Sequence, residues 1–284
     1  MTLIYDELMA SGYSDVPCDY SEKDAMFYAL AVGFGSDPLD EQELPYVLES
    51  RGPHTVPTMG AMLGYPEYLV SCGWDYNKVL HGEQKLELYR PMPAAAELLL
   101  NSSVVSAHDR GAGRGAVLRV VTEGRLKRDD AALFRADSTL IARGDGGFGG
   151  PSGSLPSPHR LPHRDADLSC DIQIEPDQAL LYRLCGDHNP LHADPVTARA
   201  AGFQAPILHG LCSYAVACRA ILKTICDYDF TLIREFDVRF SAPVYPGDIL
   251  TTEMWQDRNV VSFRCSVISR NVVVLKNGKC VLAT

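Results

Sequence analysis

The sequence predicts an α+β protein built from two similar halves, each an antiparallel sheet that curves around a long helix. A Gly- and Pro-rich stretch at 144–167 separates residues 1–143 from residues 168–284. The two halves match each other at a nearly constant spacing, and in the second half one long apolar helix precedes a series of strands. A chain of 284 residues is long enough for two domains that each bury a core.

The spacing between the halves indicates a tandem duplication. Three pairs of segments match, at offsets of 154, 152 and 152 residues: 24–30 with 178–184, 36–40 with 188–192, and 87–99 with 239–251. Similarity at a fixed period is the sign of a repeated structural unit. Residues 144–167 contain four prolines and many glycines, so we expect a linker without regular structure there.

Each half then supplies its elements in order. In the first half, strands are expected at 97–105, 116–124 and 132–143. In the second half, Pro176 is suited to the first turn of a short helix, and residues 209–226 are apolar nearly all round, as in a buried central helix. Segments rich in β-branched and aromatic residues predict strands at 232–240, 249–256, 260–268 and 272–275, the last ending at a Lys-Asn-Gly turn.

Composition excludes several classes of function. The chain has 26 basic and 36 acidic side chains, a net charge of 26 − 36 = −10, which argues against nucleic-acid binding. Its longest apolar runs are too short to span a membrane, and its first residues do not resemble a secretory leader. Nine cysteines without a Cys-x-x-Cys pair favour a reducing compartment with buried thiols.

The densest group of chemically active side chains lies at 185–195, CGDHNPLHADP. Gly and Pro hold this segment in a loop, so Asp187, Asn189 and His192 are free to converge. A carboxylate and an imidazole at one point are suited to general acid–base catalysis. Further along, Gly210 opens the central helix, where free N–H groups and the helix dipole favour negative charge on oxygen. This combination suggests proton chemistry next to a carbonyl group.

Plainer interpretations of the same residues stay open at this point. The loop could be ordinary Asx–Pro turn structure. His188 and His192 could bind a metal, but no third ligand stands at a recognisable spacing. Cys185 could be a nucleophile beside His192, although a place on the apolar face of a helix favours a buried thiol. His209 could simply cap or pack against the central helix.

The segments YRLCGDHNPLHADP and GFQAPILHGL closely resemble the (R)-specific enoyl-CoA hydratases of the MaoC-like, hot-dog-fold superfamily. Their signature is a Tyr, then Gly-Asp-x-Asn-Pro-apolar-His, then an apolar-His-Gly that opens the central helix, and every position is filled here. The segments FSAPVYPGD and LHGEQKLELYRPMP resemble the two-hot-dog members. The resemblance covers nearly the whole chain and implies a tandem, or double, hot-dog fold.

The resemblance also implies roles for individual residues. Asp187 and His192 would be the acid–base pair that adds water across the double bond of a trans-2-enoyl-CoA, with Asn189 orienting the water. The Gly210 N–H would bind the thioester oxygen, and the product would be an (R)-3-hydroxyacyl-CoA. Substrate contacts are expected from His81, Gly82, His209 and Phe240, and from Arg110 near the CoA phosphates unless Arg110 is only a solvated loop charge.

The resemblance further implies that no metal or other cofactor is needed, since CoA is part of the substrate, and that the chain forms a homodimer. We expect a cytoplasmic enzyme in a bacterium, or a peroxisomal one in a eukaryote, although the chain ends in VLAT rather than SKL. Three alternatives remain: a dehydratase of acyl-carrier-protein thioesters, a hot-dog acyl-CoA thioesterase, and a non-catalytic partner subunit.

The repeat adds a prediction that is independent of the family. An offset of 152 places Gly35, Asp37 and Asp40 at the positions of Asp187, Asn189 and His192. The first half therefore lacks the acid–base pair. We expect one active site, built by the second half, with the first half making room for the acyl chain.

Overall fold

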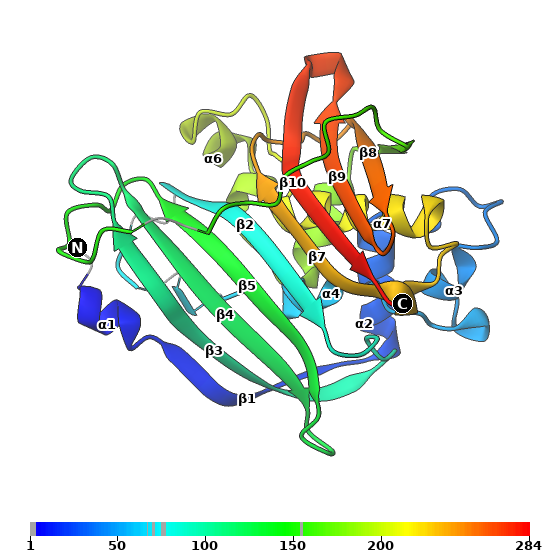
Figure 1. Ribbon diagram of the computed structural model, residues 1–284, viewed down its shortest axis with the longest axis horizontal. Helices are drawn as coiled ribbons and strands as arrows, with labels where there is room; N and C mark the ends of the chain where they lie inside the picture. Colours follow the sequence, from blue (N-terminus) through cyan, green and yellow to red (C-terminus); the bar gives the residue numbers. More distant parts are fainter. Residues whose placement is uncertain (1–3, 67, 70–71, 75–77, 154–155) are drawn as a thin grey trace.

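Ten strands form a single antiparallel sheet in the order β1-β3-β4-β5-β2-β7-β10-β9-β8-β6 (Figure 1). This computed structural model describes residues 4–66, 68–69, 72–74, 78–153 and 156–284. The strands are β1 (Gly12–Tyr20), β2 (Val79–Leu88), β3 (Ala96–Asp109), β4 (Ala116–Leu126), β5 (Ala132–Ala142), β6 (Leu168–Gln173), β7 (Ile233–Phe240), β8 (Ile249–Asp257), β9 (Val260–Val267) and β10 (Val272–Leu282). The α-helices are α1 (Tyr5–Met9), α2 (Glu22–Ala31), α3 (Leu44–Val47), α4 (Met59–Leu63), α5 (Gln178–Tyr182), α6 (Pro195–Ala200) and α7 (Gly210–Thr224). Within the described ranges, none of the helices has the length and apolar character needed to cross a bilayer.

The sheet has an approximate two-fold symmetry whose axis passes between β2 and β7. Reading outward from this junction, the first half runs β2-β5-β4-β3-β1 and the second runs β7-β10-β9-β8-β6. At the centre of the junction Lys85 pairs with Asp237, and 237 − 85 = 152, the offset of the sequence repeat. The rings of Tyr28 in α2 and Tyr182 in α5 lie 5.9 Å apart, so the equivalent helices also meet. The duplicated halves thus form one continuous sheet.

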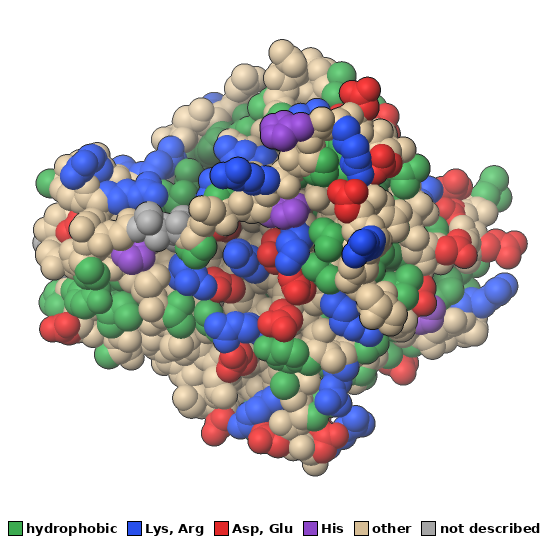
Figure 2. Space-filling view, in the orientation of Figure 1, with side chains coloured by type: hydrophobic (Ala, Val, Ile, Leu, Met, Phe, Trp, Pro, Cys, Tyr) green, Lys and Arg blue, Asp and Glu red, His purple; other side chains and the backbone are tan. Residues whose placement is uncertain are grey.

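The hydrophobic core lies between the sheet and its helices, which are behind the sheet in Figure 1. Every residue of α7 from Leu211 to Leu222 is buried, including Arg219. This agrees with a helix that is apolar nearly all round. The opposite face of the sheet carries acidic and basic side chains side by side (Figure 2). Cross-strand ion pairs such as Arg264–Glu253, at 2.6 Å, make it a solvated face.

Among the residues that the structure describes, a long central helix is present in the second half only, so the expectation of one in each half is wrong for the first. Its counterpart α4 ends at Leu63. Gly64 occupies the C-cap and Pro66 follows, a combination that stops a helix. Gly64 also leaves no space for a side chain, because a Cβ there would lie 2.9 Å from the Cβ of Ala136 on β5.

The other predicted elements are confirmed within a few residues, with one exception at the C-terminal strand. The predicted strand 272–275 continues as β10 to Leu282. Asn277 adopts a positive φ of 57°, and the register shifts between Leu275 and Gly278. The Lys-Asn-Gly segment is therefore a bulge within the strand and not its end. Strands β1, β2 and β6 were not predicted.

The segment 144–167 contains no helix or strand among its described residues, and it follows the surface from β5 to β6 (Figure 1). It is nevertheless fixed by hydrogen bonds at both ends. Asp109 accepts from the backbone N–H groups of Gly147 and Gly149, each at 2.8 Å. Near the other end, the indole N–H of Trp255 donates to the carbonyl of Arg164 at 2.8 Å. The stretch is thus an ordered connection between the halves.

Candidate active site

The loop after α5 has the turn structure that its sequence predicts. Gly186 has a φ of 134°, a backbone conformation that favours glycine. The Asp187 carboxylate accepts from the N–H of Asn189 at 3.1 Å, and the Asn189 side-chain oxygen accepts from the N–H of Leu191 at 3.0 Å. These two Asx turns set the path of the loop. They bring His192 back beside Asp187.

His192 is oriented by a single backbone group. Its Nδ1 lies 2.8 Å from the carbonyl oxygen of Ile207. Because a carbonyl oxygen only accepts, Nδ1 carries the hydrogen, and in the neutral ring Nε2 keeps its lone pair. Burial lowers the pKa of His192 below its ordinary value of 6.5, although the Asp187 charge opposes this shift. A neutral imidazole with a free Nε2 is a competent base at neutral pH.

Asp187, His192 and His209 converge on one point. One ligand-type atom from each lies within 4.8 Å of the others, so this group is a possible metal site by distance. The grouping differs from the His188–His192 pair considered from the sequence, because His188 is exposed. Hydrogen bonds occupy one nitrogen on each ring: His192 donates to Ile207, and Nε2 of His209 lies 3.2 Å from the carbonyl oxygen of Asp187. Of the four ring nitrogens, Nε2 of His192 and Nδ1 of His209 remain for a metal, together with the Asp187 carboxylate.

The N-terminus of α7 faces the same place. Gly210 is the first residue of the helix, where backbone N–H groups have no acceptor within the helix. Gly210 lines the cavity described below, and a Cβ at this position would lie 3.3 Å from the Phe240 ring. Glycine therefore lets Phe240 pack closely over the helix start. The N–H and the dipole of α7 are aimed at a site for a developing oxyanion.

A cavity of about 340 Å³ joins these groups, and both halves of the chain line it. The second half supplies Asp187, Asn189 and His192 and most of the apolar wall. The first half supplies Tyr65, Val79, Leu80, His81 and Arg143. A cavity with few polar groups and a largely apolar lining is typical of a small-molecule site.

The residues predicted to contact substrate separate into two groups. His81 and Phe240 line the cavity, with ring centroids 4.7 Å apart, and burial lowers the pKa of His81 to about 4. Gly82 and His209 are not among the lining residues. Gly82 lies at a bulge between β2 and β5, where a Cβ would meet the Ile141 side chain at 2.9 Å. Its place in the bulge sets the course of the strand beside His81.

Arg110 also lies away from the cavity lining, on the exposed turn between β3 and β4. The arginine that does line the cavity is Arg143, directly after β5, which sequence reasoning missed. Arg143 is exposed, and within the described parts of the chain its side chain has no ion-pair partner. Its position as the last residue of a predicted strand was the only available signal.

Cys185 is not suited to be a nucleophile. It is half-buried at the end of the short turn after α5, and its thiol is free. Burial raises the pKa of Cys185 to about 12, so the thiol stays protonated near neutral pH. The structure therefore favours the buried-thiol interpretation.

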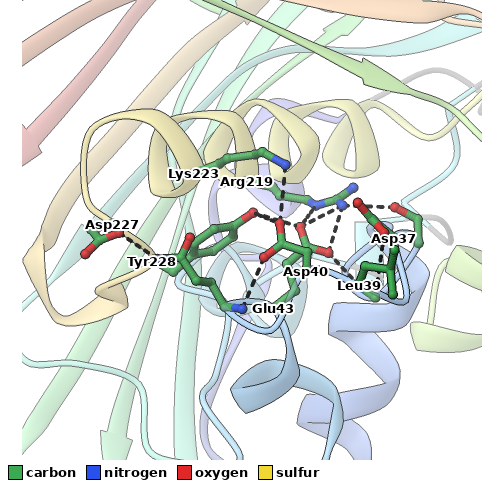
Figure 3. Close-up of polar contacts among 11 residues, drawn as sticks. Asp37, Leu39, Asp40, Glu43, Arg219, Lys223, Asp227 and Tyr228 are labelled. Atoms are coloured by element: carbon green, nitrogen blue, oxygen red, sulfur yellow. Dashed lines mark hydrogen bonds and ion pairs between the residues drawn. The ribbon is translucent and has the colours of Figure 1, made fainter.

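The equivalent loop of the first half has the same turn with different chemistry (Figure 3). The Asp37 carboxylate accepts from the N–H of Leu39 at 2.9 Å, as Asn189 does from Leu191. Beyond it, Glu43 is fully buried and bonds Arg219 of α7 at 2.7 Å. The hydroxyl of Tyr228 donates to Glu43 at 3.1 Å. A buried ion pair thus occupies the region where the second half has Asp187 and His192.

Similar proteins were found for both halves and for the whole chain. A MaoC like domain matches residues 159–277, and an MFE-2 hydratase 2 N-terminal domain matches residues 18–144. The chain is 36% identical to enoyl-CoA hydratase ChsH3 of Mycobacterium tuberculosis, with 100% of both chains covered. It is 36% identical to the peroxisomal enoyl-CoA hydratase 2 of Arabidopsis thaliana, with 95% of this chain and 93% of the relative covered. It is also 36% identical to 3-hydroxyacyl-thioester dehydratase Y of M. tuberculosis, over 84% and 82%.

Solved structures agree with these matches. A MaoC-like dehydratase from Phytophthora capsici superimposes with a TM-score of 0.85 at 29% identity, covering 99% of this chain and 98% of that one. An M. tuberculosis protein described as a double hot-dog fold superimposes with a TM-score of 0.60 at 14% identity, over 98% of both chains. This second likeness concerns the fold alone, and it confirms the expected double hot-dog architecture. The chain therefore belongs to the MaoC-like, hydratase 2-type family of hydro-lyases.

Proposed function

We propose that the protein catalyses the reversible hydration of trans-2-enoyl-CoA to (R)-3-hydroxyacyl-CoA. The observation that carries this proposal is the convergence of Asp187, His192 and the N-terminus of α7 in one cavity. The names of the relatives support a thioester substrate with a 2,3-double bond. The (R) configuration follows from the resemblance to the family.

The proposed reaction uses one water molecule. His192 Nε2 and the Asp187 carboxylate hold the water, and one of them takes a proton as the oxygen bonds to C3. The electron pair of the double bond moves toward the thioester, whose oxygen becomes enolate-like and accepts a hydrogen bond from Gly210 N–H. The same proton is then delivered to C2, so that H and OH are both added. The side-chain oxygen of Asn189 already accepts a hydrogen bond from the N–H of Leu191, so the side-chain NH2 group is the part of Asn189 that would orient the water.

The reaction as proposed needs no metal ion, so EDTA should leave the rate unchanged. Loss of the rate with EDTA and its recovery with a divalent metal would instead make Asp187, His192 and His209 a metal site. We also propose a homodimer, which sedimentation velocity tests directly.

The main experiment follows the absorbance of the enoyl thioester with acyl chains from C4 to C16 and with sterol side-chain enoyl-CoAs, followed by chiral analysis of the product. Loss of absorbance with an (R)-3-hydroxyacyl product supports the proposal. Release of free CoA thiol would indicate a thioesterase, and no reaction with any thioester would contradict the assignment. A higher rate with acyl-carrier-protein thioesters than with CoA thioesters would favour the dehydratase alternative, since the reacting centre is the same.

A further inference from the structure

His209 contacts the proposed acid–base pair without lining the cavity. Its ring is completely buried between two other rings. The centroid of the His192 ring is 3.8 Å away with an interplanar angle of 28°, and that of Tyr182 is 5.0 Å away at 47°. His209 is therefore in direct contact with the proposed base, although substrate in the cavity would not touch its side chain.

The same residue also holds the backbone of Asp187. Nε2 of His209 lies 3.2 Å from the Asp187 carbonyl oxygen, which only accepts, so Nε2 donates. The carbonyl of His209 accepts from the N–H groups of Cys212 and Ser213, each at 3.1 Å, and so begins α7. One residue thus joins the His192 ring, the Asp187 main chain and the helix start that carries Gly210.

The surroundings of His209 disfavour its charged form. The titratable residues around His209 are His192, Arg183, Tyr182 and Asp187, the last through its backbone carbonyl. Those around His192 are Asp187 and His209. Burial and the neighbouring His192 lower the pKa of His209 to about 2. A neutral ring stacked on His192 excludes water from one of its faces. This exclusion disfavours the charged form of His192 and keeps Nε2 available as a base.

We propose that His209 is a positioning residue that, through its ring, keeps His192 dry and neutral and, through its N–H, fixes the loop that carries Asp187. The proposal rests on the proposed hydratase function. It replaces the substrate-contact role that the family resemblance implied for His209.

Two variants separate the two contacts. His209→Phe keeps an aromatic ring beside His192 but has no N–H for Asp187, and we expect kcat to fall about 10-fold with little change in the pKa of His192. His209→Asn keeps an N–H donor but loses the stacked ring. Because water then reaches His192, we expect its pKa to rise toward 6.5, and the acidic limb of the kcat profile to move by the same amount. KM should change little in both variants.

The pKa of His192 is followed by NMR of the imidazole signals, with His192→Gln used to assign them. The matched control is His54→Asn, because His54 is likewise packed on two rings, those of Tyr46 at 5.4 Å and Phe230 at 4.8 Å, although it is only partly buried. Its loss should leave the titration of His192 unchanged. Wild-type protein provides a test that needs no substitution: His209 should remain in its Nε2–H form down to pH 4.

Protonation of His209 near pH 6, or the Nδ1–H form, would overturn the proposal. So would a His192 titration and a kcat that are unaltered in both His209 variants, or an effect confined to KM. The failure of the hydratase assignment is distinguishable from these outcomes. In that case wild-type protein would not hydrate any enoyl thioester, whereas the NMR titration would still report on His209.

Discussion

The loops at residues 35–43 and 187–195 follow equivalent helices in the two halves, and both contain a turn in which a side chain accepts from a backbone N–H. The two loops differ in the partners of their carboxylates. In the first half, the buried carboxylate of Glu43 is held by Arg219 and Tyr228. In the second half, Asp187 has no ion pair with Lys or Arg in the described part of the chain, and its neighbours are histidine rings. A fixed cation makes a carboxylate structural, whereas a neutral imidazole leaves it able to exchange protons.

The first residues of α4 and α7 also differ. Thr58 is the N-cap of α4 and Met59 its first residue, whereas His209 is the N-cap of α7 and Gly210 its first residue. Thr58 is buried, and its hydroxyl accepts a hydrogen bond from Tyr28 at 3.1 Å. In the first half the helix therefore begins with a buried methionine, whereas in the second half it begins with a glycine that lines the cavity. The two halves thus share a framework and differ in the side chains that it holds at corresponding places.

The largest expected effect tests which loop is catalytic. Asp187→Asn and His192→Gln should each lower kcat for enoyl-CoA hydration by roughly 10²- to 10⁴-fold, because each removes a proton-transfer group. The matched control is Asp37→Asn, at the position equivalent to Asn189, since asparagine preserves the turn to Leu39. Steady-state kinetics on all three variants, with circular dichroism to confirm folding, gives the answer. Equal activity of Asp187→Asn and Asp37→Asn would show that the second loop is not the active site.

The next largest effect concerns stability and the first loop. Glu43→Gln leaves the Arg219 guanidinium buried without its counter-charge, and we expect a loss of about 3–5 kcal/mol in the free energy of unfolding. The double variant Glu43→Leu/Arg219→Met should recover most of this loss, because no buried charge remains. Guanidinium chloride unfolding of the three proteins measures both values. If Glu43→Gln unfolded at the same denaturant concentration as wild type, the ion pair would not be the structural counterpart of the catalytic loop.

These comparisons also explain what the sequence could and could not predict. The 152-residue repeat predicted two similar halves, and the Lys85–Asp237 register agrees with it, since a symmetric junction pairs equivalent positions. The loop 187–192 was recognisable because its Gly, Pro and Asx residues act locally. Strand β2 was missed because polar residues stand at buried positions, Glu83 and Gln84, as well as at the exposed Lys85, and a bulge at Gly82 interrupts its alternation.

Contacts between distant segments were beyond the reach of local patterns. The stacking of His209 on His192 and the pairing of Glu43 with Arg219 join residues that are 17 and 176 positions apart. The length of α4 was misjudged because the repeat implied an equal helix, although Gly64 and Pro66 were visible signals for its end. Arg143 differs from Arg110 only in where the sheet places it, which composition and motif do not show.

A smaller effect should appear in the pH dependence of stability, because His81 in the first half and His209 in the second both have a lowered pKa near the site. The pKa of His81 is lowered to about 4 and that of His209 to about 2, from an ordinary value of 6.5. Below pH 6.5 the unfolded chain binds protons that the folded chain does not. As the pH is lowered below 6.5, the free energy of unfolding should therefore decrease by roughly 1.4 kcal/mol per pH unit for each histidine. For His81 this decrease continues to about pH 4, and for His209 it continues to lower pH.

Urea unfolding between pH 7 and pH 4 tests this. His81→Gln and His209→Gln should each flatten the slope by about the contribution of one histidine, whereas His163→Gln, at an exposed position, should leave it unchanged. If the unfolding free energy of His81→Gln and of His209→Gln depended on pH as steeply as that of wild type, these histidines would be protonated in the folded protein.

The smallest expected effect is on KM, and it tests whether Arg143 or Arg110 binds the CoA phosphates. Arg143 lines the cavity and is exposed, whereas Arg110 lies on a turn outside the lining. An exposed guanidinium in the cavity lining is well placed for the anionic part of a thioester whose acyl group enters the cavity, in a protein whose net charge is −10. Arg143→Gln should therefore raise KM for an enoyl-CoA about 3- to 10-fold, with kcat nearly unchanged.

The control that separates charge recognition from a general defect is the substrate itself. An enoyl-pantetheine thioester has the same reacting centre without the nucleotide phosphates, so its KM should not respond to Arg143→Gln. Arg110→Gln should leave KM unchanged with both substrates if the cavity lining decides the contact. A rise in KM with Arg110→Gln alone would return the phosphate site to the turn between β3 and β4. The first half would then still contribute to binding, but from the turn between β3 and β4 and not from the lining of the cavity that it shares with the loop 187–195.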